Sequence, residues 1–467
     1  MAISVTSLLS ISFLLITSSL AHAQIEYVTE RRLRGRNRCN IERITAQEPS
    51  HRVESEAGVT ELFDENDQQF ECAGVAFQRR IIQPRGLLPP SFFNAPRLVY
   101  ILQGRGISGT VVPGCPESFQ QFQQQSQRRR GQGQRSSDQH QRINHFREGD
   151  ILALPAGVVH WAYNDGDQPV VAITVVDTGN NANQLDRNHR QFLLAGRKQR
   201  GQRFSVEPTR QEDSNENIFN GFETESLAEV MGISRDLAEK LKGRNDNRGE
   251  IIRVEEELRV IRPSRMEREE YEEERRRQTT VNGLEQAFCS LRIKENIDDP
   301  ERADIYNPNA GRITHLNSKK LPILRYLQLN AEKGVVRPDA LISPHWNVNA
   351  HAIVYISRGS ARFQIVGLRG NTVHNNEVRQ GQVVVVPQHF ATLIRSSREG
   401  FEYVAFFTND NAIVSNIVGK DSVLKGMPVE VIMNSYRMST EEARRVKENR
   451  GEELALFEPR VQGRRYG

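Results

Sequence analysis

Two blocks of the sequence share one pattern of apolar and polar positions. In the first block, residues 98–112 read Leu-Val-Tyr-Ile-Leu-Gln-Gly-Arg-Gly-Ile-Ser-Gly-Thr-Val-Val; in the second, residues 353–366 read Ile-Val-Tyr-Ile-Ser-Arg-Gly-Ser-Ala-Arg-Phe-Gln-Ile-Val. Runs of β-branched and aromatic residues on either side of glycine predict two strands around a turn in each block. Aligning Gly106 with Gly359 places the two blocks 253 residues apart.

A second pair of related stretches follows these blocks. Gly-Asp-Ile-Leu-Ala-Leu-Pro at 149–155 corresponds to Gly-Gln-Val-Val-Val-Val-Pro at 381–387, and here the offset is 232 residues. The 21-residue difference between the offsets falls in residues 119–142, which hold ten Gln and cannot build a core. The sequence therefore predicts two copies of one unit, with an insert in the first copy. Many short strands of this kind predict a fold dominated by β-structure, of the antiparallel sandwich or barrel type.

A helical segment is expected after each β-rich unit. Residues 227–241 are amphipathic, and Ser226 and Glu229 have the spacing of a capping box at their start. Ser439 and Glu442 have the same spacing ahead of the second segment, which extends to residue 449.

The first helical segment also contains the turn pattern of a DNA-binding helix-turn-helix, Ala228-x3-Gly232-x-Ser234. A recognition helix presents Arg, Lys, Asn or Gln to the base edges. Residues 235–241, Arg-Asp-Leu-Ala-Glu-Lys-Leu, offer little of this chemistry. We therefore expect no nucleic-acid partner.

The N-terminus reads as a secretory signal peptide over residues 1–23. An apolar stretch ends in Ala-His-Ala at 21–23, a cleavage signal that would separate Ala23 from Gln24. The region before the apolar stretch departs from the usual pattern because it has no Lys or Arg. Ser and Thr interrupt the stretch, which argues against a membrane anchor, and no later segment is apolar enough to span a bilayer. We expect no membrane partner.

Charge is distributed unevenly along the chain. Residues 265–277 read Arg-Met-Glu-Arg-Glu-Glu-Tyr-Glu-Glu-Glu-Arg-Arg-Arg, a run that cannot enter a core and is expected to be exposed. Asn282-Gly283 follows, an accessible site for a protease that reads Asn, although such a pair alone is more often a turn. The net charge is +4, and residues 283–467 carry 25 Lys and Arg against 20 Asp and Glu. A cut after Asn282 would therefore give a near-neutral to acidic larger chain and a basic smaller one.

The composition is rich in side-chain nitrogen. Of the 63 basic residues, 53 are Arg, and the Gln-rich insert adds amide nitrogen. A secreted chain reaches an oxidising compartment, so its four cysteines are expected to form disulfides. Four cysteines allow three pairings, and the sequence itself does not choose among them. They are Cys39, Cys72, Cys115 and Cys289.

The octet at 282–289, Asn-Gly-Leu-Glu-Gln-Ala-Phe-Cys, resembles the processing site of the legumin-type 11S globulins, which are seed storage proteins. In that family an asparaginyl endopeptidase cuts between Asn and Gly. The family usually has Glu-Glu where this chain has Glu285-Gln286. The resemblance implies a nutrient reservoir with no catalytic residues and no cofactor.

The pattern Gly149-x5-Pro155-x-Gly157-x2-His160-x3-Asn164 matches the second motif of the cupin β-barrels, to which these globulins belong. The resemblance thus implies two cupin barrels of the jelly-roll type, each followed by a short helical segment. It also implies three parts of the chain after the signal peptide. These are an acidic chain over 24–263 with the insert 119–142, a charged linker over 264–282, and a basic chain over 283–467 that carries the second barrel.

Further expectations follow from the same resemblance. The implied disulfides are Cys39–Cys72 and Cys115–Cys289. The precursor would form trimers in the endoplasmic reticulum and travel to the protein storage vacuole, where cleavage after Asn282 permits hexamers. The partners would be copies of the same subunit or related 11S globulins. Some members of the family are food allergens.

Cupin enzymes hold a metal ion with His and carboxylate ligands, and this chain lacks that set. Counting from Gly106, the first copy has Phe92, Asn94 and Val99 where three ligands are expected, and only His160 remains. The second copy keeps His345, and His351 nearby leaves a weak improvised pair conceivable; its other ligand positions are Asn347, Ala352 and Thr392. Two alternatives remain open: a metal-dependent bicupin enzyme of the oxalate-degrading type, and a bicupin that binds a small molecule.

Overall fold

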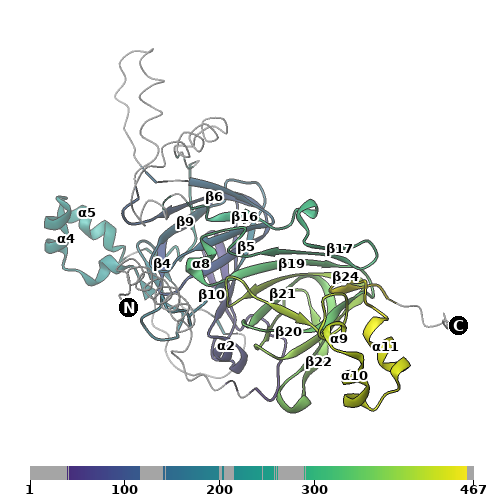
Figure 1. The fold of residues 1–467 in the computed structure, drawn as a ribbon. Coiled ribbons are helices and arrows are strands. Elements are labelled where there is room, and N and C mark those ends of the chain that lie inside the picture. Colours follow the sequence, from purple (N-terminus) through teal and green to yellow (C-terminus); the bar gives the residue numbers. More distant parts are fainter. Residues whose placement is uncertain are drawn as a thin grey trace, which may run out of the picture.

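The computed structural model consists of two β-barrels joined side by side, with a helical arm at each end (Figure 1). It describes residues 39, 41–115, 140–141, 143–198, 202–203, 215–244, 246–256, 258, 260, 289 and 291–459. The expected signal peptide and processing site, the charged run 264–282 and most of the Gln-rich insert lie outside these residues.

The first barrel is built from two antiparallel sheets. The larger sheet has the order β13-β1-β2-β3-β10-β5-β8-β16, and the smaller has the order β11-β4-β9-β6-β7 with β15 beside β4. Their bounds are β1 His51–Ser55, β2 Gly58–Leu62, β3 Ala76–Ile82, β4 Gly86–Phe93, β5 Arg97–Gln103, β6 Arg105–Val111, β7 Ile143–Arg147, β8 Asp150–Leu154, β9 Val159–Tyr163, β10 Val170–Val176, β11 Gln191–Leu193, β13 Gln202–Arg203, β15 Ile252–Arg253 and β16 Lys294–Asn296. A separate pair joins β12 Arg197–Lys198 to β14 Asn215–Glu216.

The second barrel is a single ten-stranded antiparallel sheet. Its strands are β17 Ile305–Asn307, β18 Gly311–Leu316, β19 Asn330–Val336, β20 Leu341–Asn347, β21 Ala352–Val366, β22 Thr372–Arg379, β23 Val383–Val386, β24 Ala391–Phe407, β25 Val414–Asn416 and β26 Leu456–Phe457. Short helical elements connect the strands or flank them: α2 Gln68–Ala73, η3 Ile218–Gly221, η4 Pro300–Arg302, α8 Leu324–Leu327, η5 Leu368–Gly370 and α9 Val423–Gly426.

The strands predicted in the first block are confirmed as β5 and β6. In the second block the prediction of two separate strands was wrong, because β21 is continuous from Ala352 to Val366. Its pairing with β24 shifts register on both sides of Gly359, so the chain bends there without losing its sheet bonds. A glycine in the left-handed conformation (φ 69°) allows this bend.

The two copies align differently from the sequence expectation. Arg97 pairs with Leu154 and Val176, as Ala352 pairs with Val386 and Phe407. This register sets the offset at 255 residues and matches Gly359 with Gly104, not with Gly106. Both glycines have positive φ, and both accept a backbone hydrogen bond of 3.0 Å at the equivalent point, from Glu148 and from Gln380. Aligning Gly106 with Gly359 was therefore wrong by two residues.

Helical arms follow both barrels, as predicted, but the first is not one helix. It consists of α4 (Thr224–Met231) and α5 (Arg235–Lys242), separated by Gly232 in the left-handed conformation. Glu223 is the N-cap residue of α4, so the capping box predicted at Ser226 and Glu229 was wrong. In the second arm, α10 (Val429–Tyr436) precedes α11 (Thr440–Glu448). The predicted capping box of Ser439 and Glu442 is confirmed at the start of α11.

The barrels share one hydrophobic core between their adjoining faces. Phe77 of the first barrel stacks on Tyr355 of the second, with ring centroids 5.8 Å apart, and lies 6.5 Å from Phe406. These rings are buried with aliphatic residues from both barrels. Each barrel has a further core of its own inside the sheet. The two units therefore form one packed body.

Candidate functional site

The cupin-like motif of the first copy shapes the β7–β8 turn and the strand β9. Gly149 and Gly157 both have positive φ, which glycine adopts at little cost. Asn164 is fully buried, and its side-chain amide donates to the carbonyls of Ile82 (2.8 Å) and Gln168 (2.9 Å). These contacts join the end of β9 to the end of β3 and to the loop before β10, so Asn164 has a structural role, whereas the buried His160 points into the barrel.

The strand registers identify the residues at the former ligand positions of the first barrel. Ser91 is the cross-strand partner of His160, just as His345 is the partner of Thr392 in the second barrel. Counting on from Ser91 and His345 matches Phe93 with Asn347, whereas the strand partners of Arg97 match it with Ala352, at an offset one residue larger. Counting from Gly106 had assigned Phe92, Asn94 and Val99 to the ligand positions, and this assignment was wrong because the glycines were misaligned. Phe92 instead stacks on Phe192 with ring centroids 4.9 Å apart, and Asn94 donates to Asn183 and to the Asn188 carbonyl.

A buried polar cluster occupies this part of the first barrel. The guanidinium of Arg97 lies 3.7 Å above the ring of Phe93. Arg80 donates to the Gln191 side chain (3.2 Å) and lies 3.8 Å from Glu250. Burial, followed by the positive charges of Arg97 and Arg80, holds the pKa of His160 well below its ordinary value. His160 is therefore neutral at physiological pH, and the cluster is cationic.

The sequence analysis missed this cluster. The signal available was an arginine at the start of an otherwise apolar strand, Arg-Leu-Val-Tyr-Ile at 97–101. Buried arginine is uncommon unless it is paired, so its position alone marked the strand as unusual.

The second barrel has different chemistry at the same place. His345 donates from Nδ1 to the Ser343 carbonyl (2.7 Å), and burial lowers its pKa. His351 accepts from the Gln388 amide through its Nδ1 (3.2 Å). Both rings thus use one nitrogen for a structural contact. Within the described residues, no group of three or more His, Cys, Asp and Glu side chains is arranged to hold a metal ion.

A buried carboxylate, which sequence reasoning also missed, lies near His345. Glu332 accepts from the Tyr403 hydroxyl (2.5 Å) and lies 2.9 Å from Nδ1 of the partly exposed His315. Burial alone would raise the pKa of Glu332, but His315 and the Tyr403 hydrogen bond outweigh it and lower the pKa. Burial alone would lower the pKa of His315, but Glu332 raises it. The arrangement is a charged pair inside the barrel wall.

Two disulfides connect segments that lie far apart in the sequence. Cys39 bonds to Cys72 in α2, and Cys115 after β6 bonds to Cys289 ahead of β16. This is the pairing that the resemblance implied. The second bond joins residues 174 positions apart, on opposite sides of the expected cut at Asn282.

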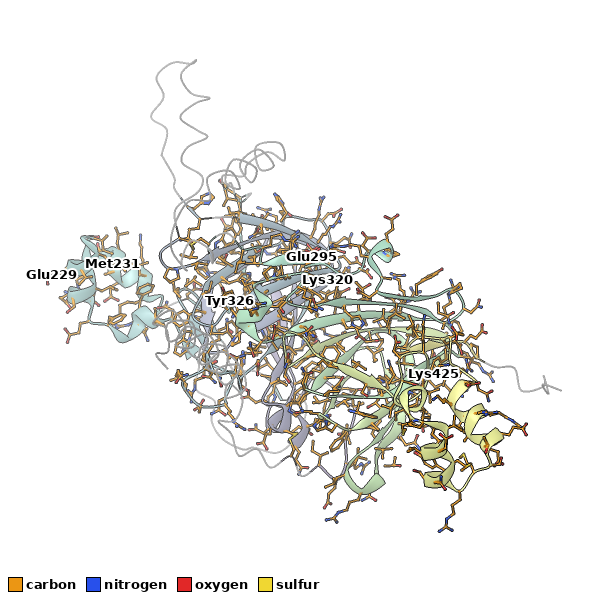
Figure 2. All side chains as sticks on the ribbon, viewed as in Figure 1. Glu229, Met231, Glu295, Lys320, Tyr326 and Lys425 are labelled. Carbon is orange, nitrogen blue, oxygen red and sulfur yellow. A yellow bond between two sulfur atoms is a disulfide. The ribbon has the colours of Figure 1, made fainter. Side chains whose placement is uncertain are left out.

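The two helical arms lie at opposite ends of the molecule (Figure 1), and both expose apolar side chains. On α4, Val230 is 86% exposed, and Figure 2 shows Glu229 and Met231 at this outer tip. The second arm, at the end where Figure 2 labels Lys425, exposes Val431 and Tyr436. No helix among the described residues is long and apolar enough to cross a membrane.

Comparisons with known proteins identify the family. The cupin family model matches residues 44–200 and 295–444. Cocosin 1 of Cocos nucifera is 55% identical over 469 residues, covering 98% of this chain and 99% of cocosin. The crystal structure of coconut allergen cocosin has a TM-score of 0.79 at 53% identity and covers 90% of this chain and 100% of that one. Recombinant pro-11S globulin of pumpkin has a TM-score of 0.79 at 42% identity, covering 91% and 100%.

The chain belongs to the 11S globulin family of seed storage proteins. The predicted fold of two cupin barrels with short helical arms is thereby confirmed. The relatives of this 11S globulin are storage proteins and not enzymes, in agreement with a barrel interior that carries arginine, phenylalanine and alanine at former ligand positions.

Proposed function

We propose that this 11S globulin is a nutrient reservoir that is made as a precursor and cut after Asn282. The products are an acidic and a basic chain joined by the Cys115–Cys289 disulfide. The observation that carries the proposal is this bond, because it spans the expected cut and would link the two products covalently. The nitrogen-rich composition supports the storage role, since 53 Arg and the Gln-rich insert 119–142 supply nitrogen on degradation.

The contacts around β16 support the same proposal. Although β16 follows the cut, it pairs with β8 in the sheet of the first barrel. Conversely, residues before β1 lie on the second barrel, where Gln47 pairs with Val383. Each product therefore contributes to the barrel of the other, so cleavage leaves the fold in place.

For assembly, we propose a closed ring of three subunits. The two helical arms are different surfaces at opposite ends of one subunit, and each exposes apolar side chains. A head-to-tail contact between different surfaces generates a ring when the rotation closes. The α4–α5 arm of one subunit would then dock on the α10–α11 arm of the next, either in identical copies or in related 11S globulins.

Cleavage would control the step from trimer to hexamer. The linker 264–282 is densely charged, and as a tethered loop it would keep two trimers apart by steric and electrostatic repulsion. A cut by an asparaginyl endopeptidase after Asn282 would free one end of the linker and allow the faces to meet. The uncleavable Asn282→Asp variant is expected to stay trimeric in sedimentation velocity after protease treatment, whereas the wild type becomes hexameric. Equal hexamer formation by both proteins would contradict this control.

The proposed location is the protein storage vacuole, reached through the endoplasmic reticulum after removal of residues 1–23. The experiment that tests storage follows the chain in seeds by immunoblotting of isolated protein storage vacuoles. We expect abundant cleaved protein at maturity and its loss during germination. A chain that is absent from these vacuoles, or that persists undegraded through seedling growth, would contradict the proposed function.

A further inference from the structure

A buried cluster in the first barrel, formed by Arg80, Arg97 and Glu250, carries more positive than negative charge. Arg97 is only 3% exposed, and Arg80 is also buried. Guanidinium groups stay protonated at any physiological pH. Glu250 is the carboxylate beside Arg80, at 3.8 Å. Two buried cations thus face one buried anion, and a buried charge without a counter-charge is costly.

Arg97 is the group without a counter-charge. Arg80 has Glu250, the Gln191 side chain at 3.2 Å and Thr60 at 3.4 Å. In the described part of the chain, by contrast, no ion pair and no side-chain hydrogen bond is found for Arg97, whose guanidinium carbon lies 3.7 Å from the centroid of the Phe93 ring. Stacking on a ring face leaves the in-plane N–H donors of a guanidinium free to bind a ligand at its edge.

Other buried polar atoms near Arg97 lack partners within the described residues. His160 faces the same interior, and its Nε2 has no hydrogen-bond partner there. The same holds for the Ser108 hydroxyl and for both polar atoms of the Gln78 side chain. Ser108 lies on β6 next to β9, which carries His160, and Gln78 lies on β3 in the opposite sheet. Buried polar groups in native proteins nearly always have a partner, so these atoms point to a bound molecule.

The equivalence of the two copies shows what has changed at this place. Arg97 occupies the position of Ala352, which is where a metal-binding cupin has its carboxylate ligand. A cation at that position repels metal ions and attracts anions. The first barrel therefore has the opposite electrostatic preference from the metal-binding barrels that it resembles, and the second barrel is neutral there.

We propose that the first barrel binds one small monovalent anion between the Arg97 guanidinium and Nε2 of His160. The class of ligand is a halide or a one- or two-carbon carboxylate. One negative charge balances the excess of one positive charge among Arg80, Arg97 and Glu250. A carboxylate also matches the paired N–H donors of a guanidinium. Neutral His160 donates through Nε2 when its other nitrogen is unprotonated.

Bromide is a direct probe because its anomalous scattering distinguishes it from water. Crystals of the full-length chain soaked in sodium bromide are expected to show an anomalous peak within hydrogen-bond distance of Arg97 and His160. The second barrel is the control in the same crystal, and no peak is expected beside Ala352 and Thr392. Water without an anomalous peak in the first barrel would overturn the proposal. Equal peaks in both barrels would overturn the role of Arg97.

A solution experiment separates anion binding from general salt effects. The thermal midpoint in sodium formate is compared with that in sodium gluconate, a carboxylate too large for a buried site, at equal ionic strength. The wild type is expected to show a higher midpoint in formate, and Arg97→Met is expected to lose the difference. Arg358→Met, which removes an exposed guanidinium, is expected to keep it. If Arg97→Met does not fold, the difference in thermal midpoint between formate and gluconate must be smaller for His160→Gln than for the wild type. An unchanged difference in His160→Gln would overturn the site.

Discussion

Lys294 of β16 donates from its ammonium group to the buried carboxylate of Asp150 in β8, at 3.0 Å. Asn296, two residues on, donates to the other oxygen of the same carboxylate at 2.9 Å. Asp150 lies before the expected cut, and both donors lie after it. Side-chain bonds and strand pairing thus hold the two products together at this point, in addition to the disulfide.

The first prediction is that the Cys115–Cys289 bond is not needed to keep the cleaved chains together. A Cys115→Ser, Cys289→Ser double variant, cleaved after Asn282, should still elute as one particle in size-exclusion chromatography without denaturant. The β16–β8 pairing and the bonds to Asp150 supply the cohesion. Adding Asp150→Ala should destabilise the particle by about 1–3 kcal/mol, since Asn296 and the partly exposed Lys294 lose their hydrogen-bond acceptor.

The matched control for this experiment is the Cys39→Ser, Cys72→Ser double variant, in which the removed bond lies within the acidic chain. It should give two chains that are linked on a non-reducing denaturing gel. Separation of the cleaved chains of the first variant under native conditions would show that the disulfide alone joins them.

The second prediction concerns the ring of subunits. Val230→Asp and Val431→Asp each place a charge on one helical arm, and each variant alone should fail to form trimers in sedimentation velocity. Mixed in equal amounts, the two variants should form dimers, because one intact pair of arms remains between them. Leu368→Asp, at an exposed site on η5 outside both arms, should still form trimers. If the mixture stays monomeric while each variant is folded, the head-to-tail arrangement is wrong.

The third prediction concerns the pair formed by His315 and Glu332. The pKa of His315 is raised, so its contribution to stability is present below its ordinary pKa of 6.5 and is lost as pH rises through the raised value. The pKa of Glu332 is lowered, so its contribution is present above its ordinary value of 4.5 and is lost as pH falls. Urea unfolding of His315→Gln should therefore differ most from wild type between pH 4.5 and 6.5. A difference that does not vary with pH would contradict the pairing.

Tyr403 gives a separate test of the same carboxylate. Tyr403→Phe removes the hydroxyl that donates to buried Glu332 and should lower the free energy of unfolding by about 1.5–3 kcal/mol, the range for hydrogen bonds to charged groups. Tyr306→Phe, at an exposed position of β17 outside both arms, is the matched control and should be nearly neutral in urea unfolding. Equal stability of both variants would show that the Tyr403 bond contributes little.

The fourth prediction concerns the core shared by the barrels. Phe77→Ala removes a ring packed against Phe63, Tyr355 and Phe406 and should cost about 3–5 kcal/mol. Because the ring joins both barrels, calorimetry should show the loss as a lower midpoint of one shared transition. Leu185→Ala, at an exposed site in the loop between β10 and β11, should leave that midpoint unchanged. Two transitions in wild type would contradict a shared core.

The sequence was enough to predict the fold class, the duplication and the motif at 149–164. Strand periodicity and glycine turns are local signals, and both copies carry them. The alignment of the copies failed because two glycines, Gly104 and Gly106, lie two residues apart, and only structural features distinguish them, namely the pairing partners of Arg97 and the positive φ of Gly104. The split of the first helical arm at Gly232 was missed because an amphipathic pattern continues in register across the break.

The interior polar groups were harder to predict. Whether Arg97, Glu332 or His315 is buried depends on which strands become neighbours, and strand neighbours here come from distant parts of the sequence. Asp150 and Lys294, for example, are 144 residues apart. From residue type alone, these charged side chains are expected at the surface. Closure of the barrel instead puts them inside the barrel or in its wall.

The most direct test of the account is gel electrophoresis of the mature protein with and without reductant, followed by N-terminal sequencing. The account predicts one band that reduction splits into a larger chain beginning at Gln24 and a smaller basic chain beginning at Gly283. A single uncut chain under both conditions, or a smaller chain with another N-terminus, would contradict the proposed processing after Asn282.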